Sequence, residues 1–236
     1  RSGESQRHSV VLLDLQSLVA EALRHDGRFV ECMGRYRQAA DLAMALDAPE
    51  ALAQAALGYD EPRWRCNLDE PYANTLLERA LARIGSGDSV LRVYLMAHLA
   101  HGSQDSMPAE QRSALLDESV AMARRLDDPR ALIESLRLHL SVDRTPDRIG
   151  WRVETLDEML RLAQRVGDKQ LTLDVLAFRI YDLVALGDVA SWSRDLDAHQ
   201  RARGEERLQR GGIAETRRAR ILHAPAARAV DAQRLE

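Results

Sequence analysis

The sequence AMARRLDDPRALIESL at residues 121–136 has two relatives elsewhere in the chain. They are AMALDAPEALAQAAL at 43–57 and LAQRVGDKQLTLDVL at 162–176. In each copy an apolar helical pattern ends in Leu or Val, a short turn with Asp or Gly follows, and a second apolar helical pattern begins. Three copies of one helical-hairpin pattern need a common structural cause.

The copies share one period. Ala43, Ala123 and Ala163 occupy the same position in them, and these alanines are separated by 80 and 40 residues. The gap predicts a fourth copy near residue 83, where ALARIGSGDSVLRVYL (80–95) lies. Further turn signals fall midway between the copies. Two turns in each period of roughly 40 residues predict one helical hairpin per period, which is typical of stacked repeat proteins.

The composition agrees with an all-α protein. The chain has 236 residues, of which 45% are apolar, 30% are charged and only 4% are aromatic, and its formal net charge is −4. A core built mainly from Leu, Ala and Val suits close helix packing better than a β-sandwich. No stretch alternates between apolar and polar residues for long enough to predict a strand.

One segment carries a closer resemblance. In RFVECMGRYRQAADL (28–42), Phe29, Cys32, Tyr36 and Ala39 follow one another at offsets of 3, 4 and 3. This rhythm resembles the second helix of a tetratricopeptide repeat (TPR), in which small residues allow close helix approach and aromatic residues fill the gap to the next hairpin. The resemblance implies a right-handed α-solenoid of four to five TPR-like hairpins with a period of about 40 residues.

The repeat pattern weakens toward the end of the chain. We predict a TPR-like repeat domain at 1–200 and a basic Arg/Ala-rich segment at 201–236, which forms a marginal helix or is disordered. The second segment has nine arginines and five acidic residues, a net charge of +4. A basic tail can bind phosphate backbones, but no helix-turn-helix pattern is present, so direct nucleic-acid binding is not expected.

A second resemblance covers about residues 15–200. The runs AALGYDEPRW (55–64), LDDPRAL (126–132) and RIYDLVALGD (179–188) look like the helical-repeat region of large LuxR-type ATP-dependent bacterial transcription regulators. In that family an NTPase module precedes the repeats, a helix-turn-helix follows them, and the repeats sense effectors or partners. Because the chain begins at Arg1 rather than Met, we expect it to be a segment of a longer protein.

Several kinds of chemistry have no support in the sequence. Lys169 is the only lysine and lies in VGDKQL, so a nucleotide-binding P-loop is absent. H-E-x-x-H, G-x-S-x-G and C-x-x-C are also absent. We predict a protein that is not an enzyme and has no cofactor or metal. Cys32 and Cys66 form no disulfide framework, and no apolar run is long enough for a membrane span, so we expect a cytoplasmic location.

HLAH at 98–101 leaves one metal hypothesis open. His98 and His101 are three residues apart on one helix face, but two ligands alone make a weak site. The alternative is that His98 packs against the core and His101 ends the helix near Gly102.

The hairpin model predicts a concave binding groove lined by the first helix of each pair. These first helices are expected near 9–24, 50–58, 89–101, 130–141 and 170–185. The period aligns Gln54, Tyr94, Glu134 and Asp174 at one polar position, and neighbouring residues extend the same face. The predicted groove residues are Tyr94, His98, His101, Glu134, Arg137, Asp174, Arg179 and Tyr181. The alternative is that they are ordinary surface residues.

A second binding candidate is the predicted loop GYDEPRWRCN at 58–67. It offers Tyr59, Arg63, Trp64 and Arg65, residue types that are enriched at interface hot spots. In the alternative interpretation, Trp64 folds back and covers the core.

We therefore predict an interaction or sensor module that holds a protein or a domain of its own polypeptide (an NTPase or DNA-binding module) in the groove. No membrane partner is expected. One alternative is a small-molecule effector site, with helices closing around Tyr94, His98 and Tyr181. An enzyme on a helical scaffold and self-association as a homodimer through the ends of the stack are further alternatives.

Overall fold

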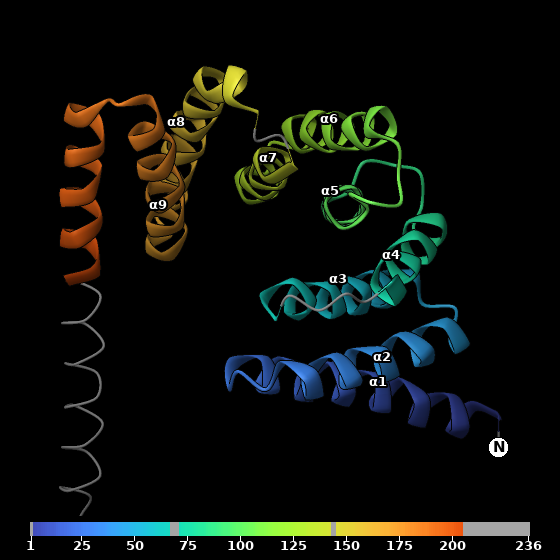
Figure 1. Cartoon of the computed structure of the whole chain (residues 1–236). Helices are drawn as coiled ribbons and strands as arrows, with labels where there is room; N and C mark the ends of the chain where they lie inside the picture. Colours follow the sequence, from blue (N-terminus) through green and yellow to red (C-terminus); the bar gives the residue numbers. More distant parts are fainter. Residues whose placement is uncertain (1, 67–70, 143–144, 205–236) are drawn as a thin grey trace, which may run out of the picture. The chain divides into compact units, whose positions relative to one another are not determined.

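The computed structural model describes residues 2–66, 71–142 and 145–204, and these ranges contain helices and turns but no strand (Figure 1). The prediction of an all-α protein is confirmed. None of the described helices is both long and apolar enough to cross a membrane. The predicted basic segment 201–236 lies, apart from its first four residues, outside the described ranges.

The helices alternate with short turns along the chain. Their bounds are α1 Ser2–His25, α2 Phe29–Ala45, α3 Pro49–Arg65, α4 Pro71–Arg83, α5 Val90–Gly102, α6 Ala109–Arg125, α7 Pro129–Val142, a 3-10 turn Pro146–Arg148, α8 Ile149–Val166 and α9 Lys169–Leu186. A further helix covers 189–204. The chain divides into two compact units, Arg1–Thr155 and Leu156–Glu236, which are described separately. The predicted domain boundary at residue 200 stays a prediction.

The repeated turns share one backbone geometry. Asp47, Asp127 and Gly167 have φ values of 51°, 50° and 70°, so each lies in the left-handed region just after a helix. At the first two turns the following N–H reaches back to the helix, from Ala48 to the Ala43 carbonyl and from Asp128 to Ala123. This is the Schellman way of ending a helix. The sequence repeat is therefore a repeat of helix termination.

The expected end of the second hairpin's first helix is wrong. We predicted a helix at 50–58 and a loop at 58–67, but α3 continues to Arg65 and includes Pro62. A proline inside a helix removes one backbone hydrogen bond. The helix nevertheless continues because the residues around Pro62 are buried: Tyr59 is 5%, Asp60 0% and Arg63 9% exposed.

The first unit is a stack in which every helix from α1 to α7 packs against the next one. The odd-numbered helices also meet one another, in the pairs α1 with α3, α3 with α5, and α5 with α7. Within the described part of the chain, α2 and α4 make no comparable contact, and neither do α4 and α6. Elements on the inner side of a curved stack approach more closely than those outside. We therefore call α1, α3, α5 and α7 the inner row.

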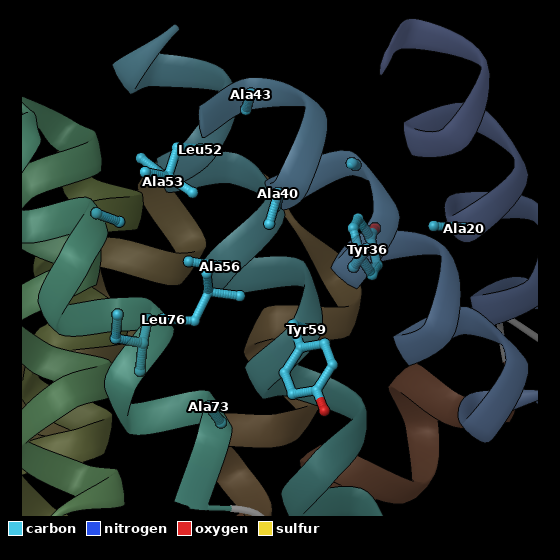
Figure 2. Close-up of a cluster of buried hydrophobic side chains, with 14 of the residues drawn as sticks. Ala20, Tyr36, Ala40, Ala43, Leu52, Ala53, Ala56, Tyr59, Ala73 and Leu76 are labelled. Carbon is cyan, nitrogen blue, oxygen red and sulfur yellow. The ribbon is translucent and has the colours of Figure 1, made fainter. Parts of the chain in front are cut away.

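Tyr36 of α2 joins the first two hairpins (Figure 2). Its hydroxyl donates a hydrogen bond to Glu21 of α1 at 2.5 Å, while its ring lies against Gly58 of α3. Burial of the phenol and the hydrogen bond to Glu21 raise the pKa of Tyr36. Around it Ala20, Ala40 and other buried alanines allow the helices to approach closely. Cys32, Tyr36 and Ala39 of the TPR-like pattern at 28–42 are thus buried where the helices pack together.

Gly58→Ala is expected to destabilise the protein by about 1–3 kcal/mol. An added Cβ would lie 2.4 Å from ring atoms of Tyr36, so the two helices would have to separate. Gly34→Ala is the matched control, because its Cβ would meet nothing within 4 Å and alanine favours the helix by about 1 kcal/mol. Urea unfolding followed by circular dichroism measures both. Equal stability of the two variants would contradict this packing.

Candidate functional site

A chain of charged side chains crosses three helices of the inner row. His98 of α5 places Nδ1 2.8 Å from Asp60 Oδ2 of α3 and Nε2 3.2 Å from Glu134 Oε1 of α7. Arg63 and Arg137 extend the chain at its two ends. These five residues (Asp60, Arg63, His98, Glu134 and Arg137) are called the charge ladder. The ladder connects three inner-row helices through side chains alone.

The two ends of the ladder differ in their exposure. Asp60 is fully buried, and its Oδ1 lies 2.8 Å from Arg63 Nη2 as an ion contact without hydrogen-bond geometry. At the other end, the Glu134 side chain is 27% exposed and the Arg137 side chain 19%. Arg137 donates two hydrogen bonds to Glu134, from Nε at 2.8 Å and from Nη2 at 2.5 Å. A paired guanidinium and carboxylate therefore reach the surface in a fixed geometry.

The two carboxylates keep His98 charged. Burial of the ring disfavours the imidazolium, but the hydrogen bonds to Asp60 and Glu134 outweigh burial and raise the pKa of His98 to about 9. Conversely, burial favours neutral carboxyls, yet the bond to His98 lowers the pKa of Asp60. The bonds from Arg137 and His98 lower the pKa of Glu134 in the same way. At neutral pH the ladder holds three cations and two anions.

His101 lies next to the ladder and behaves in the opposite way. Burial, which has the largest effect, and the nearby cations lower the pKa of His101 to about 4, so its ring is neutral at pH 7.

The end of α5 packs closely against α4. The carbonyl of Gly102, the last residue of α5, accepts a 2.8 Å hydrogen bond from the side chain of Asn74 of α4. Side chains of Arg63 and Asn74 occupy the space where a Cβ of residue 102 would lie.

Five of the predicted groove residues come together in the first unit. Tyr94, His98 and His101 belong to α5, while Glu134 and Arg137 belong to α7. Tyr94 is half-buried, and burial together with the charges of Asp128 and Glu134 raises its pKa to about 12. Tyr94 and Glu134, which the 40-residue period aligned, are therefore close to each other.

The other three predicted groove residues lie in the second unit. Arg179 of α9 binds Asp157 of α8 at 2.6 Å and also pairs with Asp195. It therefore ties three helices of that unit together. Asp174 is exposed and accepts a 2.9 Å hydrogen bond from Gln170, and Tyr181 is 71% exposed. That these three continue the row of the first unit stays a prediction.

The prediction of a binding loop at 58–67 is wrong in its structure. Tyr59 and Arg63 are buried within α3, and Tyr59 packs edge-on against Tyr72 of α4 with ring centroids 5.5 Å apart. Trp64 and Arg65 also belong to α3, but their side chains lie outside the described residues. Arg63 contributes to the charge ladder rather than to a flexible recognition loop.

Sequence reasoning missed Asp60, the most buried member of the ladder. This residue lies in the predicted loop at 58–67, where a carboxylate is expected to face water. The period itself held a signal, because the equivalent positions 100 and 140 are Ala100 and Leu140, both buried. An acidic residue at a position that is apolar in other repeats indicates a buried charge that needs a partner.

A hollow of about 260 Å³ lies between α6 and α7, away from the ladder. Its lining combines apolar and polar side chains: Ala109, Arg112, Ser113, Leu116, His139 and Val142. Within the described ranges, no group of three or more His, Cys, Asp or Glu residues is placed to hold a metal ion. Both ring nitrogens of His98 face carboxylates, and this arrangement stabilises a proton.

No protein-family model matches the chain. No curated protein matches it either. Among solved structures, it resembles BtubC (BKLC) from P. vanneervenii at 18% identity, with a TM-score of 0.64 over 86% of this chain and 87% of that one.

Two structures of a putative kinesin light chain from Podospora anserina with nearly identical TPR-like repeats are also similar. They have TM-scores of 0.56 at 14% and 15% identity, and cover 83% and 82% of this chain and 96% of theirs. At these identities the likeness shows the fold. The chain has a TPR-like helical-repeat fold, and the α-solenoid prediction is confirmed.

Proposed function

We propose that this chain is a non-catalytic interaction module that binds a protein partner, or a neighbouring domain of its own polypeptide, on the surface formed by α3, α5 and α7. The observation that carries the proposal is the charge ladder. It presents Glu134 and Arg137, partly exposed and paired, next to the half-buried Tyr94. Tyr and Arg are residue types that dominate interface hot spots.

The buried half of the ladder explains why this surface suits binding. The protonated imidazole of His98 contacts Glu134 on its buried side and pairs with Asp60 through its other nitrogen. It therefore fixes the position of the Glu134–Arg137 pair. A surface whose charged side chains are already ordered loses less conformational entropy on binding. It also selects partners by charge complementarity. Glu134 and Arg137 are held in place by the ladder, so they cannot move away from a like charge on a mismatched partner.

We further propose that the module is the regulatory segment of a LuxR-type ATP-dependent bacterial transcription regulator. The runs at 55–64, 126–132 and 179–188 support this by resemblance, and the TPR-like fold agrees with it. The test is the coding sequence on either side of this segment. A P-loop upstream and a helix-turn-helix downstream are expected. Flanking regions of another type would overturn this placement and leave the interaction surface to be tested separately.

Site-directed photo-crosslinking tests the surface. A benzophenone amino acid is placed at inner-row positions Gln54, Tyr94 or Arg130, and at Glu78 of α4 or Gln111 of α6 as exposed controls outside the inner row. In cells that produce the chain, or its full-length parent, adducts are expected from inner-row positions. Adducts formed only from α4 and α6 would contradict the proposal.

Arg137→Ala is expected to weaken partner binding roughly tenfold or more, as hot-spot arginines do. The fold should persist, because Glu134 keeps its contact with His98. The yield of the Tyr94-position adduct and a circular dichroism melt measure the two effects. Arg79→Ala on α4 is the matched control, since it removes an exposed arginine outside the inner row. An equal loss of adduct in both variants would contradict the assignment.

A small-molecule effector is the second candidate, and the hollow between α6 and α7 favours it. Arg112 and His139 could orient an anionic group there, with Leu116 and Val142 contacting an apolar part. The volume is slightly below the range of drug-sized ligand sites, so a small organic acid is the fitting class. NMR titration with benzoate and benzamide tests this: shifts at His139 with benzoate alone are expected, and no shifts with either compound would remove this candidate.

A further inference from the structure

The first helix exposes an unusual row of apolar side chains. Val11, Leu15 and Leu18 of α1 are 64%, 50% and 68% exposed. Their spacing of four and three residues places them on one face of the helix. The opposite face carries Leu13, Ala20 and Leu23, which are buried against the rest of the stack. We call the row formed by Val11, Leu15, Leu18 and Ala22 the α1 stripe.

The α1 stripe occupies a register that is covered in later hairpins. One period of 40 residues aligns Leu15 and Leu18 with Ala55 and Gly58 of α3, and two periods align them with Leu95 and His98 of α5. Ala55, Leu95 and His98 are buried, and Gly58 lies directly against Tyr36 of the preceding helix α2. The α1 stripe is therefore a face built to receive another helix.

We propose that the α1 stripe is covered by the α1 stripe of a second copy of this chain. The two α1 helices run antiparallel about a two-fold axis near Asp14 and Leu15. In this register Val11 of each copy meets Leu18 of the other, because the two residues lie equally far from the axis on opposite sides of it. The stripe is thus self-complementary, as an interface between identical subunits must be.

Charges beside the α1 stripe agree with this arrangement. Arg7 lies seven to eight residues before the axis and Glu21 six to seven after it, on the same flank, so each Arg7 lies near a Glu21 of the second copy. The Glu21 side chain is 49% exposed, although it also binds Tyr36 and Arg24. The two Asp14 side chains form a like-charge pair near the axis. The favourable pairs at both ends fix the antiparallel direction.

The size of the interface sets the expected affinity. One helix face from each copy covers less area than the roughly 800 Å² per partner of a standard stable interface. We therefore expect a dimer that forms at micromolar concentrations and dissociates on dilution. Because the contact uses the same patch on both copies, association stops at two chains.

Sedimentation velocity of the whole chain between 1 and 200 µM tests the dimer. Leu15→Glu is expected to shift the dissociation constant upward at least tenfold without changing the circular dichroism melt, because residue 15 is half-exposed in the single chain. Val30→Glu on α2 is the matched control. Val30 is exposed but lies off the α1 stripe, so this variant should dimerise like the wild-type chain. A wild-type chain that remains monomeric at 200 µM would overturn the proposal, as would growth into longer oligomers.

Cysteine crosslinking tests the antiparallel direction. In a Cys66→Ser background, a mixture of Val11→Cys and Leu18→Cys chains should form mixed disulfide dimers several-fold faster than either chain alone. The native Cys32 is buried and serves as the internal control for unspecific oxidation. Faster crosslinking of each variant with itself would indicate parallel helices and overturn the arrangement. Neither experiment depends on the inner-row surface, so the two proposals succeed or fail separately.

Discussion

Replacing Asp60 with alanine is expected to lower the free energy of unfolding by about 3–5 kcal/mol. Asp60 is fully buried and contacts both His98 and Arg63. Its removal leaves two positive charges in a poorly solvated interior with one fewer anion, and the loss of one partner from a buried ion pair is among the most costly single changes. Chemical denaturation of the variant measures this effect.

Asp88→Ala supplies the comparison for this variant. Asp88 also forms an ion pair, with Arg125 at 2.6 Å, but both side chains are well exposed. Water replaces a lost partner there, so its unfolding midpoint should stay close to that of the wild-type chain. If Asp60→Ala and Asp88→Ala were equally stable, the charge ladder would not be a buried structural element.

Stability is expected to fall by roughly 3 kcal/mol between pH 6.5 and 9 because of His98. The pKa of His98 is about 9 in the folded chain against an ordinary value of 6.5. A raised pKa in the folded state means that the folded chain binds the proton more tightly, so the stabilisation is complete below pH 6.5 and is lost as the pH rises through 9. The limiting slope is about 1.4 kcal/mol per pH unit.

His101 acts on the acid side. Its pKa falls from 6.5 to about 4 in the folded chain, so its contribution is present above pH 6.5 and is lost as the pH falls through 4. Together the two histidines place the stability maximum near pH 6.5. Denaturant unfolding at a series of pH values measures both limbs, and His98→Gln should flatten the alkaline limb. An alkaline limb with the same slope in His98→Gln would assign the effect to another group.

The hairpin architecture followed from the sequence because helix ends are local features. Asp47, Asp127 and Gly167 mark the same left-handed turn, and their spacing counts hairpins without any knowledge of tertiary contacts. The end of α3 did not follow, because Pro62 is locally a helix breaker. Its helix persists through the burial of Tyr59, Asp60 and Arg63, which depends on neighbouring hairpins.

The candidate site was predictable by position but not by partner. The period placed Tyr94 and Glu134 on one face, and both lie there. It could not show that His98 is pinned between Asp60 and Glu134, since those contacts span 38 and 36 residues and depend on how closely α3, α5 and α7 approach. The role of Arg179 within its ion pairs likewise depends on partners, Asp157 and Asp195, that lie on other helices.

The charge ladder joins the three inner-row helices α3, α5 and α7, and nitrogen-15 NMR of the His98 imidazole measures that link most directly. With Asp60 at Nδ1 and Glu134 at Nε2, both ring nitrogens should carry protons at pH 7, and the resonances should titrate with a pKa near 9. A neutral imidazole with a single tautomer at pH 7, titrating at or below 6.5, would contradict both the ladder and the inner-row packing that creates it.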